Sequence, residues 1–346
     1  MERTSPRLRG LLPAALLAAL LLYATWPWLP FARAERTPPT IVFYGFSILA
    51  DAFHDGIFPA FQKTWAAEGG GRVEFVSSFG GSGTVTNQLL MGVPAQVALL
   101  SLESDADRLA DAGVIARDSW KRLPNAGVLN LTPFVIVVRP GNPLGIRGFE
   151  DLGRAGVRVV HPDPMTSGGA NWAIVAEYGS GFRGSPGGAA AGEAVVRGVW
   201  KNVVAQAASA RAARTQFENG FGDALVTYEQ DALYDRARGR FHADIAYPSR
   251  TILSEHMLVV VDRNIRPRER PLVDRFVRFL WSDEAQRVFV RFGFRSVRPE
   301  LDAGNPGFGG IADPFRIADF GGWRRARHDI VDGIWKDRVM KAAAPR

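Results

Sequence analysis

Residues 157–178 read VRVVHPDPMTSGGANWAIVAEY and set the architecture of the chain. An apolar run of strand length at 157–160 leads into a glycine turn at 166–169, and a stretch with helical spacing follows at 170–178. A short run of this kind is typical of a strand buried on both faces of a sheet. Strand followed by helix is the unit from which α/β proteins are built. The stretch therefore predicts a buried parallel strand that a glycine turn joins to a helix.

The same alternation continues on both sides of this stretch. Further apolar runs of strand length lie at 41–44, 73–76, 97–100, 134–138, 224–228 and 257–261. Stretches with helical character lie between and after them, at 51–65, 84–91, 193–202, 212–219 and 271–281. The pattern predicts an α/β fold with mainly parallel sheets. The chain has 346 residues, which gives room for two or three domains at roughly 100–200 residues each.

A second glycine turn has the same build as the first. Residues 79–84 read FGGSGT and stand between the strand at 73–76 and the helix at 84–91. Glycine leaves backbone N–H groups uncovered, and the start of a helix adds up to about four unpaired N–H donors and roughly half a positive charge. Ser82 and Ser167 add hydroxyl donors. The two turns together predict an anion site made of neutral groups, with ordinary serine-capped turns as the alternative.

Other kinds of chemistry find little support in the sequence. There is no cysteine, which excludes disulfides, thiol nucleophiles and Cys-ligated metals. The five histidines form no His-Glu-x-x-His motif, the phosphate-binding motif with its lysine is absent, and Thr84 interrupts a hydrolase-type Gly-x-Ser-x-Gly. The net charge of +7 is not gathered in one basic block, so we expect no nucleic-acid partner. We expect no enzymatic activity, no cofactor and no metal.

The first residues have the features of an export signal. Arg3, Arg7 and Arg9 precede an apolar run at 11–31, which ends in the small-x-small sequence Ala32-Arg33-Ala34. This combination predicts a cleaved signal peptide over residues 1–34, with an uncleaved N-terminal anchor as the alternative. In both cases the basic flank stays inside and the rest of the chain is exported, so we expect a periplasmic protein.

Six motifs, taken in order, resemble one family. They are GGSG at 80–83, DPMTSGGANW at 163–172, ASAR at 208–211, GDALVTYE at 222–229, PSRTILSE at 248–255 and FGGW at 320–323. With these motifs the chain is similar, from about Thr40 to Val339, to the periplasmic sulfate/thiosulfate-binding proteins of ABC importers. The resemblance implies the type II periplasmic binding protein fold, in which two α/β lobes close on a ligand. Lobe one would comprise 40–132 plus 249–346, and lobe two 133–248.

The resemblance also implies a ligand site. The family holds a tetrahedral dianion by hydroxyl groups, backbone N–H groups and an indole N–H, without a direct cationic partner. Carried over by matched position, the contacts would come from Ser82, Ser167, Gly168, Gly169 and the N–H of Ala210.

Three positions depart from the family pattern. Residues 45–49 read GFSIL where the family has an Asp-Pro-Thr-type turn, and we expect Ser47 or its neighbours to supply that contact. Tyr228 stands where the family has the tryptophan, and Asn171 stands where it has an arginine. A phenol also donates one hydrogen bond, but it reaches differently from an indole. The departures leave sulfate, thiosulfate, molybdate, tungstate, phosphate and a small organic anion open as ligands.

The expected function is that of an exported binding component of an ABC importer. It would bind sulfate or a related tetrahedral oxyanion between its lobes, as a monomer, and deliver it to a permease in the cytoplasmic membrane. The alternative is a receptor of the same fold for molybdate, phosphate or an organic anion, serving a sensor or a different transporter. An exported hydrolase ranks third, because no nucleophile–base pair is visible.

Overall fold

The chain forms an N-terminal unit, Met1–Pro39, and a main unit, Thr40–Arg346. The computed structural model describes residues 6–25, 38–239 and 242–341. In the N-terminal unit helix α1 spans Pro6–Thr25, and its residues 16–25 are exposed. The predicted cleavage sequence Ala32-Arg33-Ala34 lies outside the described residues. None of the helices in the described ranges combines the length and the hydropathy that a membrane span requires.

The strands of the main unit join in one sheet, which has eleven strands among the described residues. Its order is β2-β1-β3-β9-β4-β7-β5-β6, with β8 and β10 paired to β4 and with β11 paired to β9. The strands are β1 Thr40–Phe46, β2 Glu74–Gly80, β3 Val97–Leu100, β4 Val128–Val138, β5 Val159–Pro162, β6 Val203–Ala207, β7 Ala224–Tyr228, β8 Asp244–Ala246, β9 Arg250–Val260, β10 Arg295–Ser296 and β11 Asp313–Phe315. β1 pairs in parallel with β2 and β3, and β5 with β6 and β7. The predicted α/β fold is confirmed.

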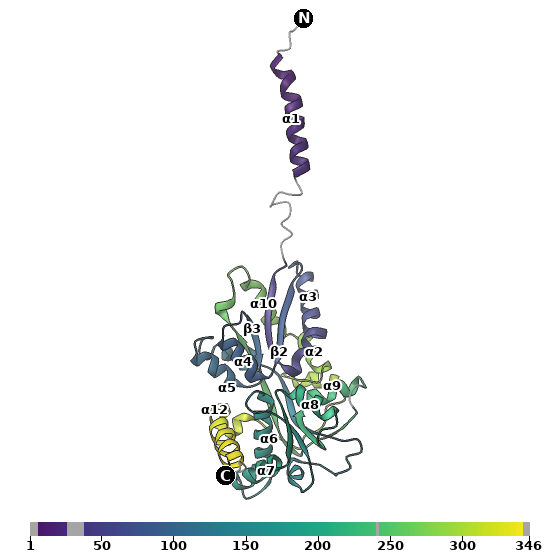
Figure 1. Ribbon diagram of the computed structural model, residues 1–346, viewed down its shortest axis with the longest axis vertical. Coiled ribbons are helices and arrows are strands. Elements are labelled where there is room, and N and C mark those ends of the chain that lie inside the picture. Colours follow the sequence, from purple (N-terminus) through teal and green to yellow (C-terminus); the bar gives the residue numbers. More distant parts are fainter. Residues whose placement is uncertain (1–5, 26–37, 240–241, 342–346) are drawn as a thin grey trace. The chain divides into compact units, whose positions relative to one another are not determined.

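Helices follow most of the parallel strands, as the sequence predicts (Figure 1). The α-helices of the main unit are α2 Ala50–Ala52, α3 Phe58–Ala67, α4 Ser82–Leu90, α5 Glu103–Asp111, α6 Gly168–Gly184, α7 Ala189–Lys201, α8 Ala210–Glu218, α9 Glu229–Ala237, α10 Arg270–Leu280, α11 Asp283–Arg291 and α12 Gly322–Ala326. Two segments are π-helical, η3 Phe53–Ile57 and η10 Arg327–Met340. Short 3-10 helices are η2 Ser47–Leu49, η4 Ser119–Arg122, η5 Pro124–Gly127, η6 Phe149–Gly153, η7 Asp262–Asn264, η8 Pro299–Gly304 and η9 Ile317–Phe320.

Two long strands, β4 and β9, run through the middle of the sheet. The first half of β4 pairs with β9, down to Pro133 opposite Leu253. Its second half pairs with β7 from Phe134 opposite Tyr228 onward. The other end of β9 pairs with β3. β4 and β9 therefore connect the strands before residue 132 with those of 133–248.

The C-terminal segment packs on the helices α6 and α7. The indole rings of Trp172 and Trp323 lie 4.4 Å apart between their centroids, and those of Trp200 and Trp335 lie 5.0 Å apart. Figure 1 shows the C-terminal helix in yellow, formed by α12 and η10, beside α6 and α7, and η10 contacts both of these helices. Part of the segment that is expected in lobe one thus contacts helices of 133–248.

A buried histidine joins β4 to β9. His256 is fully buried opposite Asn130, with its Nδ1 2.6 Å from the amide oxygen of Asn130 and its Nε2 3.2 Å from the hydroxyl of Ser254. The Ser254 hydroxyl in turn donates to the carbonyl of Thr132 over 2.6 Å. Burial lowers the pKa of His256 to about 3. The imidazole is therefore neutral at ordinary pH and links the two strands by hydrogen bonds alone.

We expect the free energy of unfolding to fall as the pH drops below 6.5. Unfolded His256 takes up a proton near its ordinary pKa of 6.5, but the folded protein resists protonation down to about 3. Because the folded pKa is lowered, the stabilisation is complete above 6.5 and is lost between 6.5 and 3. Between pH 7 and pH 5 this amounts to about 2 kcal/mol.

Denaturant unfolding at several pH values measures this loss. The His256→Gln variant has no imidazole to protonate, so its free energy of unfolding should fall by about 2 kcal/mol less than that of the wild type over the same range. An equal pH dependence in the two proteins would contradict the assignment.

Candidate functional site

The turns before three helices meet at Gly81. This residue precedes α4, and a Cβ atom on it would lie 2.4 Å from the carbonyl oxygen of Thr166, before α6, and 2.6 Å from that of Ala208, before α8. The N–H of Gly83 donates to the same Thr166 oxygen over 3.1 Å. Each helix start carries unpaired N–H groups and a partial positive charge. The carbonyl oxygens at Gly81 hold the three turns against one another, and the N–H groups that the helix starts leave unpaired are thereby brought close enough to serve one anion.

Ser167 and Ala210 stand at two of these helix starts. Ser167 precedes α6, is only 3% exposed, and makes no side-chain capping bond to the helix. Its hydroxyl is therefore available to a ligand. Ala210 is the first residue of α8, so its N–H has no acceptor within that helix. Ser47 begins η2, which contacts α8, and is half-buried.

Ser82, the first residue of α4, has its hydroxyl proton directed away from these turns. The hydroxyl donates to Oδ2 of Asp105 over 2.7 Å and accepts the N–H of Ser101 over 3.1 Å. Asp105 is buried on α5, and this burial raises its pKa, although the bond from Ser82 acts in the opposite direction. In this arrangement Ser82 offers an anion the N–H at its helix start, and its hydroxyl has to be redirected to take part.

Gly168 and Gly169 allow side chains from distant strands to reach the start of α6. A Cβ atom on Gly168 would lie 2.8 Å from the Cβ and Oγ of Ser101 and 2.9 Å from the Cβ of Ser82. On Gly169 it would lie 2.9 Å from Cε2 and 3.1 Å from Oη of Tyr228. Any larger residue would push these groups apart. The two glycines thus bring the predicted residues Ser82 and Tyr228 against the same turn.

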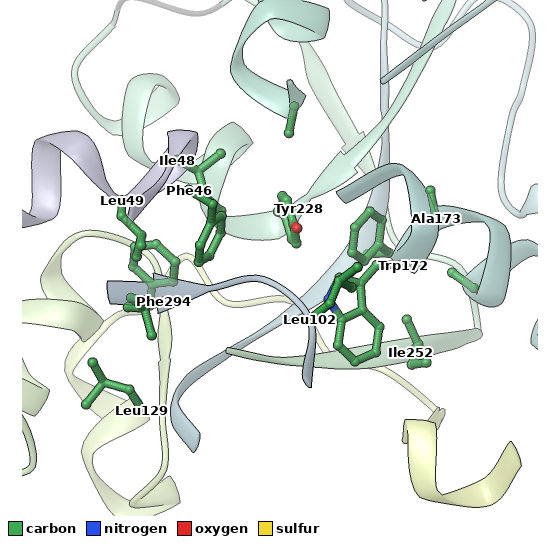
Figure 2. Close-up of a cluster of buried hydrophobic side chains, with 14 of the residues drawn as sticks. Phe46, Ile48, Leu49, Leu102, Leu129, Trp172, Ala173, Tyr228, Ile252 and Phe294 are labelled. Carbon is green, nitrogen blue, oxygen red and sulfur yellow. The ribbon is translucent and has the colours of Figure 1, made fainter. Parts of the chain in front are cut away.

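Tyr228 lies in the middle of a buried cluster, between Phe46 and Trp172 (Figure 2). Its hydroxyl oxygen is 2.8 Å from the Oγ of Ser101. Burial raises the pKa of Tyr228, so the phenol stays protonated and can donate a hydrogen bond. The indole N–H of Trp172 donates to the carbonyl oxygen of Ser101 over 2.8 Å.

The charged groups near the turns are held by opposite charges. Arg211, next to Ala210, pairs with Asp51 of α2 over 2.7 Å. Arg108 lies 3.4 Å from Asp105. Asn171 is neutral and ties the turn together by donating to the carbonyl oxygens of Pro164 and Ser167. No group of three or more metal-ligating side chains occurs in the described part of the chain. The arrangement favours anion binding through neutral donors.

The structure brings most of the predicted residues together. Ser82, Ser167, Gly168, Gly169 and Tyr228 surround one turn, Ala210 begins the helix next to it, and Ser47 lies on η2 against that helix.

Sequence reasoning missed Ser101 and Asp105. Ser101 directly follows the strand at 97–100, and its place at the carboxyl end of a parallel strand is the one signal that could have pointed to it.

Comparison with known proteins gives consistent similarities. The family model described as bacterial extracellular solute-binding protein matches residues 49–295. The chain is 34% identical to the sulfate-binding protein of Synechococcus elongatus over 314 residues, covering 89% of this chain and 87% of that protein. It is 31% identical to the thiosulfate-binding protein of Pseudomonas aeruginosa over 341 residues, covering 95% and 98% of the two chains.

Solved structures of periplasmic binding proteins also resemble this chain. The structure of the sulfate-binding protein SubI from Mycobacterium tuberculosis superposes with a TM-score of 0.76 at 29% identity, covering 84% of this chain and 99% of that one. A periplasmic thiamin-binding protein reaches a TM-score of 0.67 at 17% identity over 90% of this chain and 99% of that one. The latter likeness concerns the fold alone.

Proposed function

Since this chain belongs to the family of bacterial extracellular solute-binding proteins, we propose that it binds sulfate or a closely related tetrahedral oxyanion and delivers it to an ABC permease. Its relatives include sulfate-binding and thiosulfate-binding proteins that match more than four fifths of the chain. The protein acts outside the cytoplasmic membrane, in the periplasm, as a monomeric carrier without catalysis or cofactor.

The observation that carries the proposal is the meeting of the α4, α6 and α8 starts at Gly81. A tetrahedral dianion has acceptor oxygens in every direction and needs donors from several sides. Helix starts supply N–H groups, and Ser167 supplies an available hydroxyl. Because the nearby Arg211 already pairs with Asp51, the anion is neutralised by dipoles rather than by a cation.

In this proposal the anion lies between two lobes, 40–132 plus 249–346 and 133–248. β4 and β9 connect the lobes and serve as the hinge. Closure is supported by contacts from one side to the other, such as the bond from Gly83 N–H to Thr166 O and the ion pair of Asp51 with Arg211. Ligand binding favours the closed form, which the permease recognises.

The ligand contacts in the proposal are those expected from the sequence. Backbone N–H groups come from Gly168, Gly169 and Ala210, and hydroxyl groups come from Ser47, from Ser167 and, once it is turned away from Asp105, from Ser82. Tyr228 contributes its phenol from behind the same turn, where it is bonded to Ser101. Fixed donors on all sides disfavour a ligand that carries its own protons, because its O–H groups would face N–H groups.

Calorimetric titration with sulfate, thiosulfate, molybdate and phosphate tests the function. We expect sulfate or thiosulfate to bind most tightly. Tightest binding of molybdate or phosphate would favour the receptor alternative. Absence of binding to all four anions would refute the proposal.

We expect Ser167→Ala to weaken oxyanion binding by about 1.5–3 kcal/mol, because a buried anion oxygen loses a hydroxyl donor. Ser119→Ala is the matched control, since the hydroxyl of Ser119 has no hydrogen-bond partner within the residues that the structure describes. Calorimetry on the two variants and the wild type gives the comparison. Equal affinity in all three would show that Ser167 does not contact the ligand.

A further inference from the structure

We infer that Ser101 contacts the bound oxyanion, and that Tyr228 acts on the ligand through it as a positioning residue. This inference rests on the proposed function and names a further determinant of the same site. Neither the glycine turns nor the family resemblance points to Ser101.

Ser101 is hydrogen-bonded to three residues around the site, Ser82, Trp172 and Tyr228. It is fully buried at the end of β3. Its N–H donates to the hydroxyl of Ser82 over 3.1 Å, and its carbonyl accepts the indole N–H of Trp172 over 2.8 Å. Because both backbone groups are bonded, the position of its Cβ is fixed. Its Oγ lies 2.8 Å from where a Cβ on Gly168 would stand, so the hydroxyl faces the turn at the start of α6.

The hydrogen bond between Ser101 and Tyr228 has a preferred direction. The two oxygens lie 2.8 Å apart, and either could donate. A phenol is a much stronger acid than an aliphatic alcohol, which makes it the better donor and its oxygen the poorer acceptor. Tyr228 therefore donates to Ser101. Each hydroxyl carries one hydrogen, so the hydrogen of Ser101 is left for a further acceptor.

Ring packing holds the phenol of Tyr228 beside Ser101. Between ring centroids, Tyr228 lies 4.5 Å from Phe134 and 6.1 Å from Phe46. Figure 2 shows Phe46 beside Tyr228. The ring cannot swing toward a ligand without moving these neighbours. The phenol instead orients and polarises the hydroxyl of Ser101, which becomes a stronger donor to an anion oxygen.

A double-mutant cycle tests the inference through the dissociation constant for sulfate, or for thiosulfate if that binds more tightly. We expect Ser101→Ala to weaken binding about 10- to 150-fold, because a donor to a charged oxygen is lost. Tyr228→Phe should weaken it about 2- to 4-fold, through the lost polarisation. In the Ser101→Ala background, Tyr228→Phe should have no further effect. Ser119→Ala should bind like the wild type.

Three results would overturn the inference. The first is unchanged binding in Ser101→Ala. The second is an equal loss on Tyr228→Phe with and without Ser101, which would mean that the phenol contacts the ligand directly. The third is an unfolded fraction of anion-free Ser101→Ala, under the conditions of the titration, that is large enough to account for its whole loss of affinity. If the wild type binds none of the oxyanions, the proposed function fails first and the inference falls with it.

Discussion

Replacing Gly81 with alanine is expected to weaken oxyanion binding about 10- to 100-fold, the cost of overfilling a close-packed contact. The backbone of Gly81, with φ −60° and ψ 140°, suits any residue. The obstacle is space, because the new Cβ would lie 2.4 Å and 2.6 Å from the carbonyl oxygens of Thr166 and Ala208. Since both atoms belong to the backbone, the starts of α6 and α8 must move away from α4.

Gly80→Ala is the matched control for this prediction. A Cβ on Gly80 would have nothing within 4 Å, so the neighbouring substitution leaves the three helix starts in place. Calorimetric titration with sulfate should give the affinity of the wild type for Gly80→Ala and the large loss for Gly81→Ala. If both variants bind like the wild type, the anion does not lie where the helix starts meet.

The largest expected change in stability comes from Glu177. Its carboxyl group is fully buried on α6, with Oε1 3.1 Å from Nε2 of His161 and Oε2 accepting the indole N–H of Trp200 over 3.2 Å. Nδ1 of His161 donates to the carbonyl of Pro162 over 2.7 Å. Burial raises the pKa of Glu177. Glu177→Ala should lower the free energy of unfolding by about 3–5 kcal/mol, because His161 and Trp200 lose a buried partner.

Glu177→Gln separates hydrogen bonding from packing. The amide can donate to Nε2 of His161 and accept from Trp200, so this variant should lose clearly less stability than Glu177→Ala. Denaturant unfolding of both variants measures the difference. Equal losses in the two would mean that the amide does not restore the hydrogen bonds of the carboxyl group, and a small loss in Glu177→Ala would mean that these contacts contribute little to folding.

The sequence predicted most of the strands, but it predicted only about half of each of the two longest strands, β4 and β9. Apolar runs at 134–138 and 257–261 mark parts of β4 and β9, which in fact span Val128–Val138 and Arg250–Val260. The missed halves contain Asn130 and His256, buried polar residues that satisfy one another across the two strands. A pattern based on apolar runs does not detect strands whose core side is polar. The strand β6 was missed as well, since only its last residue, Ala207, is buried and the others alternate between partly exposed and exposed positions.

The site was predictable where local sequence determines it. Strand, glycine turn and helix follow one another within a few residues at 79–84 and 166–170, so these turns could be read directly. The partners of Ser101 lie far away in the sequence, with Tyr228 127 positions distant and Trp172 71 positions distant. The place of Ser101 after a strand marks it as a candidate but does not reveal these partners. Its role emerges only from the pairing of strands that brings these side chains together.

The packing of Trp323 and Trp335 on α6 and α7 has a consequence for biogenesis. These two residues are synthesised well after the helices that they cover. Such contacts between distant parts of a chain form late and slow the folding reaction. The main unit therefore completes its core only after residues 323–335 have been synthesised.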